Sequence, residues 1–258
     1  MITVALPKGR IAEDTLAIFR EIFGSKFAFE DRKVILDEGN FRFLMVRNQD
    51  IPTYVIEGAA DIGVVGLDVL EEHRPDVVRL LDLKIGVCRV CVGIKNEDEL
   101  DLTKPELKIA TKMPNIARAY FAQKAIALKI IKLYGSIELA PLVGLADAIV
   151  DVVETGSTMK QNGLKIGETI MQSSAHLIAN KNSFIIKKDK ILELLKRLVK
   201  ERNIGMLLVT HDFGVVAKVA DRLAVMSEGR IVESGDTREI FEHPTHPASR
   251  ELVGAFEY

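Results

Sequence analysis

The first 200 residues alternate short apolar runs with segments whose apolar residues recur at helical spacing. Strands are predicted at residues 2–6, 41–47, 61–66, 84–93, 107–111, 128–133 and 148–153. Helices are predicted at residues 11–22, 52–58, 68–73, 115–124 and 138–143, and a longer one at 187–202. Strands that alternate with helices predict open α/β layers with mostly parallel sheets. We expect the chain to cross into a second lobe near residues 84–95 and to return near 168–180.

The composition is that of a globular protein with nearly balanced charge. Of 258 residues, 48% are hydrophobic, and 35 basic against 37 acidic residues give a net charge of −2. This balance argues against a protein that coats nucleic acid. No apolar run approaches the roughly 18 residues that a membrane span needs, and the N-terminus lacks the basic segment of a secretory signal. We therefore expect a cytoplasmic protein with no membrane span and no nucleic-acid partner.

The two cysteines, Cys88 and Cys91, form a C-x-x-C pattern that invites a redox or zinc interpretation. Their setting argues against it, because residues three apart in a strand point to opposite faces. A redox pair needs a helix N-terminus, and a zinc site needs a second ligand pair, which the sequence lacks. We predict two buried structural thiols and no metal-ligating residues.

The most informative stretch is the end of the predicted strand at 148–153 and the turn that follows it. Asp151 and Glu154 supply two carboxylates, which can accept hydrogen bonds from sugar hydroxyls. The turn, named here the 155–158 loop, consists of Thr155, Gly156, Ser157 and Thr158. Glycine lets a ligand approach the backbone, and the hydroxyls with the first free amides of a helix suit an anion. The pattern fits a sugar-phosphate site, but an ordinary helix start with a Ser or Thr N-cap fits it equally well.

Basic residues occupy the first predicted turn of the chain. Lys8 and Arg10 flank a glycine between strand and helix, where cations oppose the helix dipole, so an anionic partner would explain them. A solvated turn is the alternative. Arg47 and Asp68 also follow predicted strands, and in open α/β sheets that edge faces the ligand.

Six collinear blocks are together more specific than any one of these features. They are Leu6–Arg10, Val46–Val55, Gly58–Asp68, Ile109–Asn115, Gly135–Pro141 and Val150–Thr158. Through them, residues 1 to about 200 resemble the catalytic subunit of the ATP phosphoribosyltransferase family in its short form. That family opens histidine biosynthesis.

The resemblance implies a two-lobed α/β fold with mixed sheets, similar to periplasmic binding proteins of the second type. Residues 1–84 and 168–202 would form lobe I, and residues 85–167 would form lobe II, which carries the 155–158 loop. Residues 203–258 would add a C-terminal α/β fragment.

The resemblance also implies a reaction. The family joins ATP to phosphoribosyl pyrophosphate with Mg²⁺ and releases pyrophosphate. Asp151 and Glu154 would bind the ribose hydroxyls, the 155–158 loop would bind the 5′-phosphate, and Asp68 would contact substrate. The pyrophosphate and ATP phosphates would be bound by Lys8, Arg10 and Arg47. A regulatory subunit resembling histidyl-tRNA synthetase, in a homodimer or a hetero-oligomer, is the implied partner.

The last 56 residues depart from this family. Four segments resemble the C-terminal end of a peptide-importer ABC-transporter ATPase: Met206–Val216, Asp221–Met226, Glu228–Glu233 and Ile240–Pro247. In that resemblance His211 would be the switch histidine that senses a γ-phosphate. The sequence has no G-x-x-x-x-G-K-[ST] loop, however, so such a histidine has nothing to sense. An apolar strand is predicted at Met206–Thr210, without the neighbours that such a strand normally has.

Three kinds of function remain open at this point. A phosphoribosyltransferase explains most of the features. A bilobal small-molecule binding protein is expected to carry an export signal and does not need the 155–158 loop, whereas the sequence shows the loop and no such signal. A nucleotide-binding transporter subunit is supported by the tail alone, and an inactive or chimeric protein combining the two resemblances is a further alternative.

Overall fold

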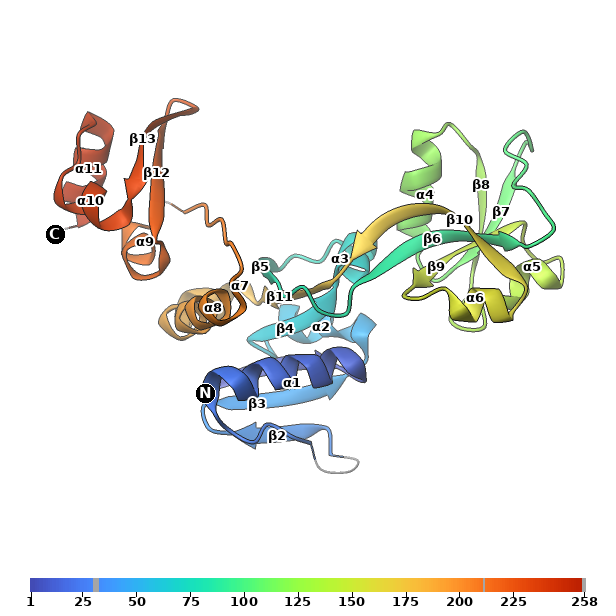
Figure 1. Cartoon of the computed structure of the whole chain (residues 1–258), viewed down its shortest axis with the longest axis horizontal. Coiled ribbons are helices and arrows are strands. Elements are labelled where there is room, and N and C mark those ends of the chain that lie inside the picture. The colour runs from blue at the N-terminus through green and yellow to red at the C-terminus, as the bar shows by residue number, and fades with distance from the viewer. Residues whose placement is uncertain (30–32, 211, 257–258) are drawn as a thin grey trace. The chain divides into compact units, whose positions relative to one another are not determined.

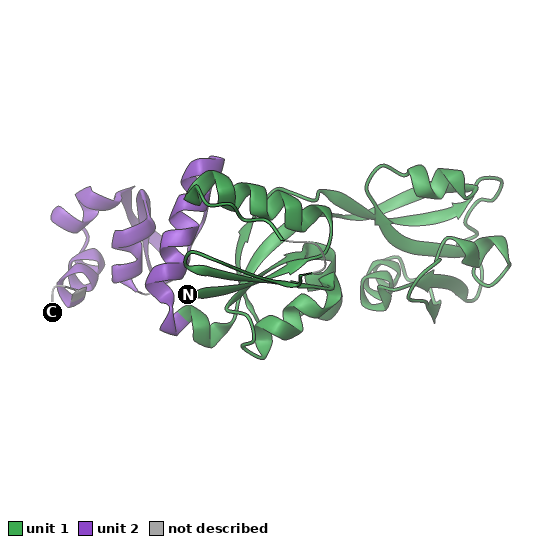
Figure 2. Cartoon of the chain, turned by 90° about the horizontal axis from the view of Figure 1, so that it is seen from below, with its two compact units in different colours: residues 1–184 green, residues 185–258 purple. Residues whose placement is uncertain are grey.

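The computed structural model describes residues 1–29, 33–210 and 212–256 (Figure 1). Contacts divide the chain into two units, residues 1–184 and residues 185–258 (Figure 2). The first unit contains two sheets, each the centre of a lobe. Among the residues described, no helix has the length and apolar character needed to cross a membrane.

Lobe I is built on a six-stranded sheet. In spatial order its strands are β2 (Ile35–Glu38), β3 (Phe41–Val46), β1 (Ile2–Pro7), β4 (Ile62–Gly66), β11 (Ala175–Ala179) and β5 (Val78–Asp82). β1 pairs in parallel with β3 and β4, whereas β2, β11 and β5 make antiparallel pairs. The sheet is therefore mixed and not mostly parallel. The parallel strands β3, β1 and β4 form its centre, β2 adds an antiparallel edge beside β3, and β11 and β5 add antiparallel strands beside β4.

Helix α1 (Arg10–Phe23) forms because its apolar residues recur on one face, as predicted. Ala12, Thr15, Leu16, Ile18 and Phe19 are buried on that face. The ring of Phe19 meets those of Phe41 and Phe43 edge-on, with centroids 5.1 and 5.2 Å apart. Such aromatic pairs add to the burial of apolar area, so this cluster fixes α1 against the sheet. Helices α2 (Ile51–Ile56) and α3 (Leu67–His73) complete the lobe.

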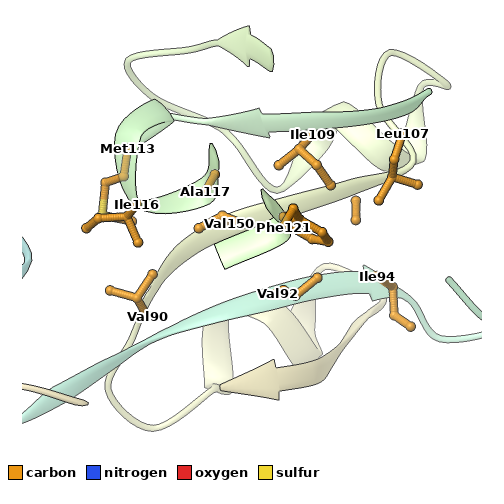
Figure 3. Close-up of a cluster of buried hydrophobic side chains, with 11 residues drawn as sticks. Val90, Val92, Ile94, Leu107, Ile109, Met113, Ile116, Ala117, Phe121 and Val150 are labelled. Atoms are coloured by element: carbon orange, nitrogen blue, oxygen red, sulfur yellow. The ribbon is translucent and has the colours of Figure 1, made fainter. Parts of the chain in front are cut away.

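Lobe II is built on a five-stranded sheet. Its strands, in spatial order, are β10 (Leu164–Ser173), β6 (Cys88–Lys95), β9 (Ala148–Val153), β7 (Leu107–Thr111) and β8 (Leu128–Lys132). The helices are α4 (Pro114–Gln123), α5 (Leu139–Leu142) and α6 (Ser157–Gln161). Val92, Ile109 and Phe121 belong to a buried cluster that joins the sheet to α4 (Figure 3). β9, β7 and β8 are parallel, so their carboxyl ends lie at one edge of the sheet.

The chain crosses between the lobes twice, and the two crossings lie side by side. β6 leaves lobe I and β10 returns, paired antiparallel with it (Figure 1). At the base of this pair, the backbone N–H of Leu83 donates to Ala175 O at 2.9 Å, and the N–H of Ala175 donates to Ile85 O at 2.9 Å. β10 continues to Ser173, and β11 of lobe I begins at Ala175.

Within the second unit, α8 (Lys188–Arg202) buries Ile191, Leu192, Leu194, Leu195 and Leu198. The short helix α7 (Lys181–Ile186) spans the boundary between the units. The remaining elements are α9 (Phe213–Val219), β12 (Arg222–Ser227), β13 (Arg230–Asp236), α10 (Thr237–Glu242) and α11 (Pro247–Phe256). Contacts group α8 with the residues that follow it, and the resemblance had implied residues 168–202 as part of lobe I.

The predicted strand at Met206–Thr210 is wrong: these residues form no strand. Leu207 and Val209 are 93% and 89% exposed. A strand needs a neighbour for its backbone groups, and the two-stranded sheet of this unit pairs only β12 with β13. His211, the predicted switch histidine, lies outside the described residues.

Both cysteines are free and lie in β6. Cys91 is fully buried, as predicted, but Cys88 is only partly buried because it begins the strand at the crossing between the lobes. Burial raises the pKa of the Cys88 thiol, which keeps it protonated at neutral pH. The two thiols form no disulfide with each other in this structure.

Candidate active site

The 155–158 loop joins β9 to α6 at the carboxyl edge of the lobe II sheet. Thr155, Ser157 and Thr158 are exposed. The hydroxyls of Thr155 and Ser157 lie 2.9 Å apart, and the Ser157 backbone N–H donates to Thr155 Oγ1 at 3.3 Å. The N-cap position of α6 is Gly156, which has no side chain to cap the helix. The loop therefore presents hydroxyls to solvent, and one of them, that of Thr155, also accepts from a first-turn amide of α6.

Gly156 gives the loop its shape. Its φ of 83° lies in the left-handed region, which glycine adopts without steric cost. A Cβ at this position would lie 3.0 Å from the Ile166 side chain, so the residue is tight as well as left-handed. The left-handed backbone of this turn therefore requires glycine at position 156.

The two predicted carboxylates have different partners. Asp151, in β9, has a side chain 23% exposed and lies 3.2 Å from the Lys112 ammonium. Glu154, just after β9, is 55% exposed and accepts a hydrogen bond from the Arg10 guanidinium. Sequence reasoning did not identify Lys112. The structure shows why it lies there. β7 pairs in parallel with β9 and Thr111 is level with Val150, so Lys112 and Asp151, the residues that follow them, are neighbours.

The basic turn between β1 and α1 contacts the region of the 155–158 loop through Arg10, which donates to Glu154. Arg10 is 67% exposed, and besides Glu154 it faces Asp14 at 3.8 Å. Lys8 and Arg47 are exposed and follow β1 and β3, which are neighbours in the sheet. The Lys8 backbone N–H donates to Val46 O at 3.1 Å. Lys8 and Arg47 therefore lie at the same edge of the lobe I sheet, where β1 and β3 end. Helix α1 starts without a side-chain cap, and a helix start of this kind suits an anion.

Asp68 has a different environment from the other predicted site residues. It lies in the first turn of α3 and is 9% exposed. Ser173 Oγ donates to Asp68 Oδ1 at 2.9 Å, and the Asp68 backbone N–H donates to Ser173 Oγ at 3.1 Å. The structure brings Arg10 and Glu154 together, but it places Asp68 in a buried contact between α3 and the end of β10.

Across the described part of the chain, no group of three or more His, Cys, Asp or Glu side chains is placed to hold a metal ion. Asp151 and Glu154 offer carboxylate oxygens, which Mg²⁺ accepts singly or in pairs when substrate phosphates supply other ligands. The donor set thus fits a magnesium ion that arrives with a phosphorylated substrate.

The fold and the site define a two-lobed α/β protein with a hydroxyl-rich, glycine-containing loop on one lobe and a basic turn on the other. The periplasmic aliphatic sulphonate binding protein SsuA of Escherichia coli shares this fold, with a TM-score of 0.50 at 11% identity over 85% of this chain and 77% of that one. Residues 47–200 match the HisG family, described as ATP phosphoribosyltransferase. The chain belongs to the ATP phosphoribosyltransferase family.

Several relatives agree with this assignment. The ATP phosphoribosyltransferase of Campylobacter curvus (strain 525.92) is 86% identical over 201 residues, which are 78% of this chain and 98% of the relative. That of Helicobacter hepaticus is 64% identical over 198 residues, or 77% and 97%. The ATP phosphoribosyl transferase (HisG:HisZ) complex of Thermotoga maritima contains a chain that is 34% identical with a TM-score of 0.68, over 78% of this chain and 98% of that one.

The family match stops at residue 200, near the end of α8. The second unit therefore combines a helix from the matched region with elements outside it. Roughly a fifth of this chain lies outside the alignments with the relatives.

Proposed function

We propose that this chain transfers the phosphoribosyl group of phosphoribosyl pyrophosphate to an adenine ring nitrogen of ATP, with release of pyrophosphate, at the 155–158 loop and the basic turn of residues 8–10. This is the first step of histidine biosynthesis, the reaction of its family. The observation that carries the placement is the hydrogen bond between Arg10 of lobe I and Glu154 of lobe II. This bond supports a single site that combines the basic turn with the 155–158 loop.

Each part of the substrate has a matching group in this proposal. The hydroxyls and amides of the 155–158 loop bind the 5′-phosphate, and the carboxylates of Asp151 and Glu154 accept hydrogen bonds from the ribose hydroxyls. Arg10, Lys8 and Arg47 balance the charge of the pyrophosphate and of the ATP phosphates. Charge-assisted hydrogen bonds of this kind contribute about 1.5–3 kcal/mol each.

The transfer needs no side-chain nucleophile. The adenine nitrogen brings its own lone pair to the anomeric carbon, and the bond from that carbon to pyrophosphate breaks. The residues therefore act by aligning the two substrates and by stabilising the charge that develops on the leaving group. Mg²⁺ bound to the pyrophosphate would share that charge.

Glu154 must change partners when substrate binds. In the structure it accepts from Arg10, whereas in the proposed complex it accepts from a ribose hydroxyl and Arg10 turns to the pyrophosphate. Both side chains are exposed, so this exchange costs little: exposed ion pairs contribute only about 0–1 kcal/mol. Phosphoribosyl pyrophosphate thus replaces a weak contact.

The test is a comparison of two Asp→Asn variants from the same strand region. Asp151→Asn removes the charge beside Lys112, and we expect the KM for phosphoribosyl pyrophosphate to rise by about tenfold or more. Asp147→Asn is the matched control, because Asp147 pairs with Lys104 at the opposite end of β9. Product formation is measured with ATP, Mg²⁺ and phosphoribosyl pyrophosphate. Equal kinetics for the two variants would remove Asp151 from the site.

The same assay separates the alternatives. ATP hydrolysis without phosphoribosyl pyrophosphate would favour a transporter-type nucleotide-binding subunit, and ligand binding without turnover would favour a bilobal binding protein. Formation of phosphoribosyl-ATP with stoichiometric pyrophosphate supports the transferase.

A partner subunit is the second part of the proposal. The related Thermotoga maritima protein was solved as a HisG:HisZ complex. We infer that this chain also assembles with a HisZ-type regulatory subunit, one resembling histidyl-tRNA synthetase. Co-expression of the two chains followed by mass measurement in solution tests this, and a homodimer that never takes up the second chain would contradict it.

The tail is proposed to have no catalytic function of its own. The sequence contains no G-x-x-x-x-G-K-[ST] loop, so the ABC-transporter ATPase resemblance expected for residues 203–258 would come without the loop that ATP hydrolysis needs. We therefore assign them no ATPase activity.

A further inference from the structure

Helix α3 of lobe I contacts lobe II at both of its ends. Its first turn holds Asp68, which exchanges two hydrogen bonds with Ser173 at the end of β10. Its last turn holds Glu72, whose side chain reaches the start of α4. One short helix therefore meets the second lobe at two separate points.

The Glu72 contact is closely defined. Its carboxylate accepts from the Asn115 backbone N–H at 2.9 and 3.1 Å and from the Ile116 N–H at 2.9 Å. In return, Asn115 Nδ2 donates to the backbone oxygen of Glu72 at 2.9 Å. Glu72 is only 4% exposed. A buried carboxylate is costly unless hydrogen bonds satisfy it, so the position of each donor is fixed by this contact.

Helix α4 lacks a cap from its own sequence. Its N-cap residue is Met113, which makes no side-chain hydrogen bond, and Pro114 occupies the first turn. The free amides at a helix start attract negative charge. Glu72 supplies from lobe I the cap that α4 does not supply for itself.

The capped turn leads directly to the proposed active site. Asn115 lies three residues after Lys112, whose ammonium is 3.2 Å from Asp151. Thr111 and Met113 flank Lys112: the Met113 N–H donates to Thr111 Oγ1 at 2.9 Å, and that hydroxyl donates to Val150 O at 2.6 Å. Thr111 and Met113 are buried. The turn is thus held by β9 on one side and by Glu72 on the other.

We propose that Glu72 is a positioning residue for phosphoribosyl transfer: by capping α4 across the lobes, it fixes the turn that carries Lys112 and so the placement of Asp151 relative to the basic turn of lobe I. This inference rests on the proposed function. Glu72 touches no substrate in it and acts through Lys112 and through the angle between the lobes.

The test compares Glu72→Gln with Glu71→Gln. Both variants lose one negative charge at adjacent positions in α3, but Glu71 is partly exposed and pairs with Arg79 at 2.7 Å within lobe I. Glutamine at 72 keeps the size of the side chain, but its NH₂ group faces a backbone N–H where an acceptor is needed. A misplacement of about 1 Å can lower turnover on the order of 10²-fold, so we expect a fall in kcat of about ten- to a hundredfold for Glu72→Gln.

A KM-against-kcat split distinguishes positioning from general destabilisation. The ligand groups themselves are unchanged, so the KM values for both substrates should stay within about threefold while kcat falls. Activity is normalised to the folded fraction from calorimetry. A Glu72→Gln kcat within about twofold of the Glu71→Gln value overturns the proposal, as does a loss that only follows the folded fraction.

Two further measurements keep the test decisive. If Glu72→Gln does not fold, Asn115→Ala removes only the Nδ2 bond to Glu72 O, and a smaller kcat loss with unchanged KM is expected. Hydrogen exchange at the Asn115 and Ile116 amides reads the contact without any activity assay, and faster exchange is expected in Glu72→Gln. If the wild-type chain catalysed no transfer, the proposed function would fail, while exchange equal to wild type in Glu72→Gln would refute the cap.

Discussion

Gly156 shows how a single residue links backbone conformation to substrate access. Its φ of 83° opposes any larger residue, and so does the Ile166 side chain, which would lie 3.0 Å from an added Cβ. Left-handed backbone costs a non-glycine residue about 1–3 kcal/mol. A side chain at this position would press on Ile166 and shift the loop that is proposed to bind the 5′-phosphate.

We predict that Gly156→Val abolishes transfer while the chain stays folded with a lowered Tm. The control is Gly163→Val, because Gly163 has a φ of 68° with no atom within 4 Å of an added Cβ. That variant has the same backbone penalty outside the loop. Steady-state assays and calorimetry on both variants check this, and normal turnover in Gly156→Val would remove the loop from the mechanism.

At this scale the sequence predicted residue types better than residue partners. Exposed, polar Arg10 and Glu154 could be proposed from their places after strands, and the structure pairs them. Asp68 also follows a strand, but it is buried against Ser173, a residue 105 positions later in the chain. A contact over that separation depends on the path of β10, which local patterns do not specify.

Among the elements, strands and helices with a strong period were predicted and weakly patterned ones were missed. α1 and α8 have clear apolar faces, and both form. β10 was missed because its burial does not alternate regularly and its pairing with β6 shifts register twice. The Met206–Thr210 prediction failed for the opposite reason, since its apolar composition is strand-like but no neighbour pairs with it.

Glu233 of β13 accepts hydrogen bonds from the segment before α11, and this contact depends on pH. The Ser249 hydroxyl, the N–H and hydroxyl of Thr245 and the His246 N–H lower the pKa of Glu233 to about 2. The Thr245 N–H and hydroxyl donate to Glu233 Oε1 at 2.9 and 2.7 Å. Glu233 thus ties β13 to the segment that precedes α11.

A depressed carboxyl pKa stabilises the folded state above the ordinary pKa of 4.5, and this stabilisation is lost as pH falls toward about 2. We therefore expect Glu233→Gln to lower the Tm of the second unit at neutral pH, with the difference from wild type shrinking between pH 4.5 and about 2. Arg238→Gln, which affects the exposed Arg238–Glu242 pair of α10, is the comparison variant. A Tm difference that stays constant over this pH range would contradict the assignment.

At the scale of the whole molecule, the family match and the contact units end at different places. The match runs to residue 200, whereas the contact boundary lies between residues 184 and 185. Helix α8 thus belongs to the family by sequence and to the second unit by contact. The contacts that group it there include Lys188 and Asp189 with Asp212 and Lys218.

We predict that a chain ending at Arg202 keeps its kcat and its KM for phosphoribosyl pyrophosphate within about twofold, because charge and loop residues of the proposed site all precede that point. Its unfolding should be monitored by calorimetry, since the truncated chain loses the Lys188–Asp212 and Asp189–Lys218 ion pairs. Loss of transfer in a folded, truncated chain would show that the tail is functional.

The two crossings between the lobes lie side by side at Leu83, Ile85 and Ala175, which makes it possible to design hybrid proteins. The chain leaves lobe I after Ile85 and returns at Ala175, and two backbone hydrogen bonds join these points. Residues 86–174 can therefore be exchanged as one continuous segment. Exchanging it for the matching stretch of a relative should give hybrid enzymes whose sugar-phosphate loop comes from one parent and whose basic turn comes from the other.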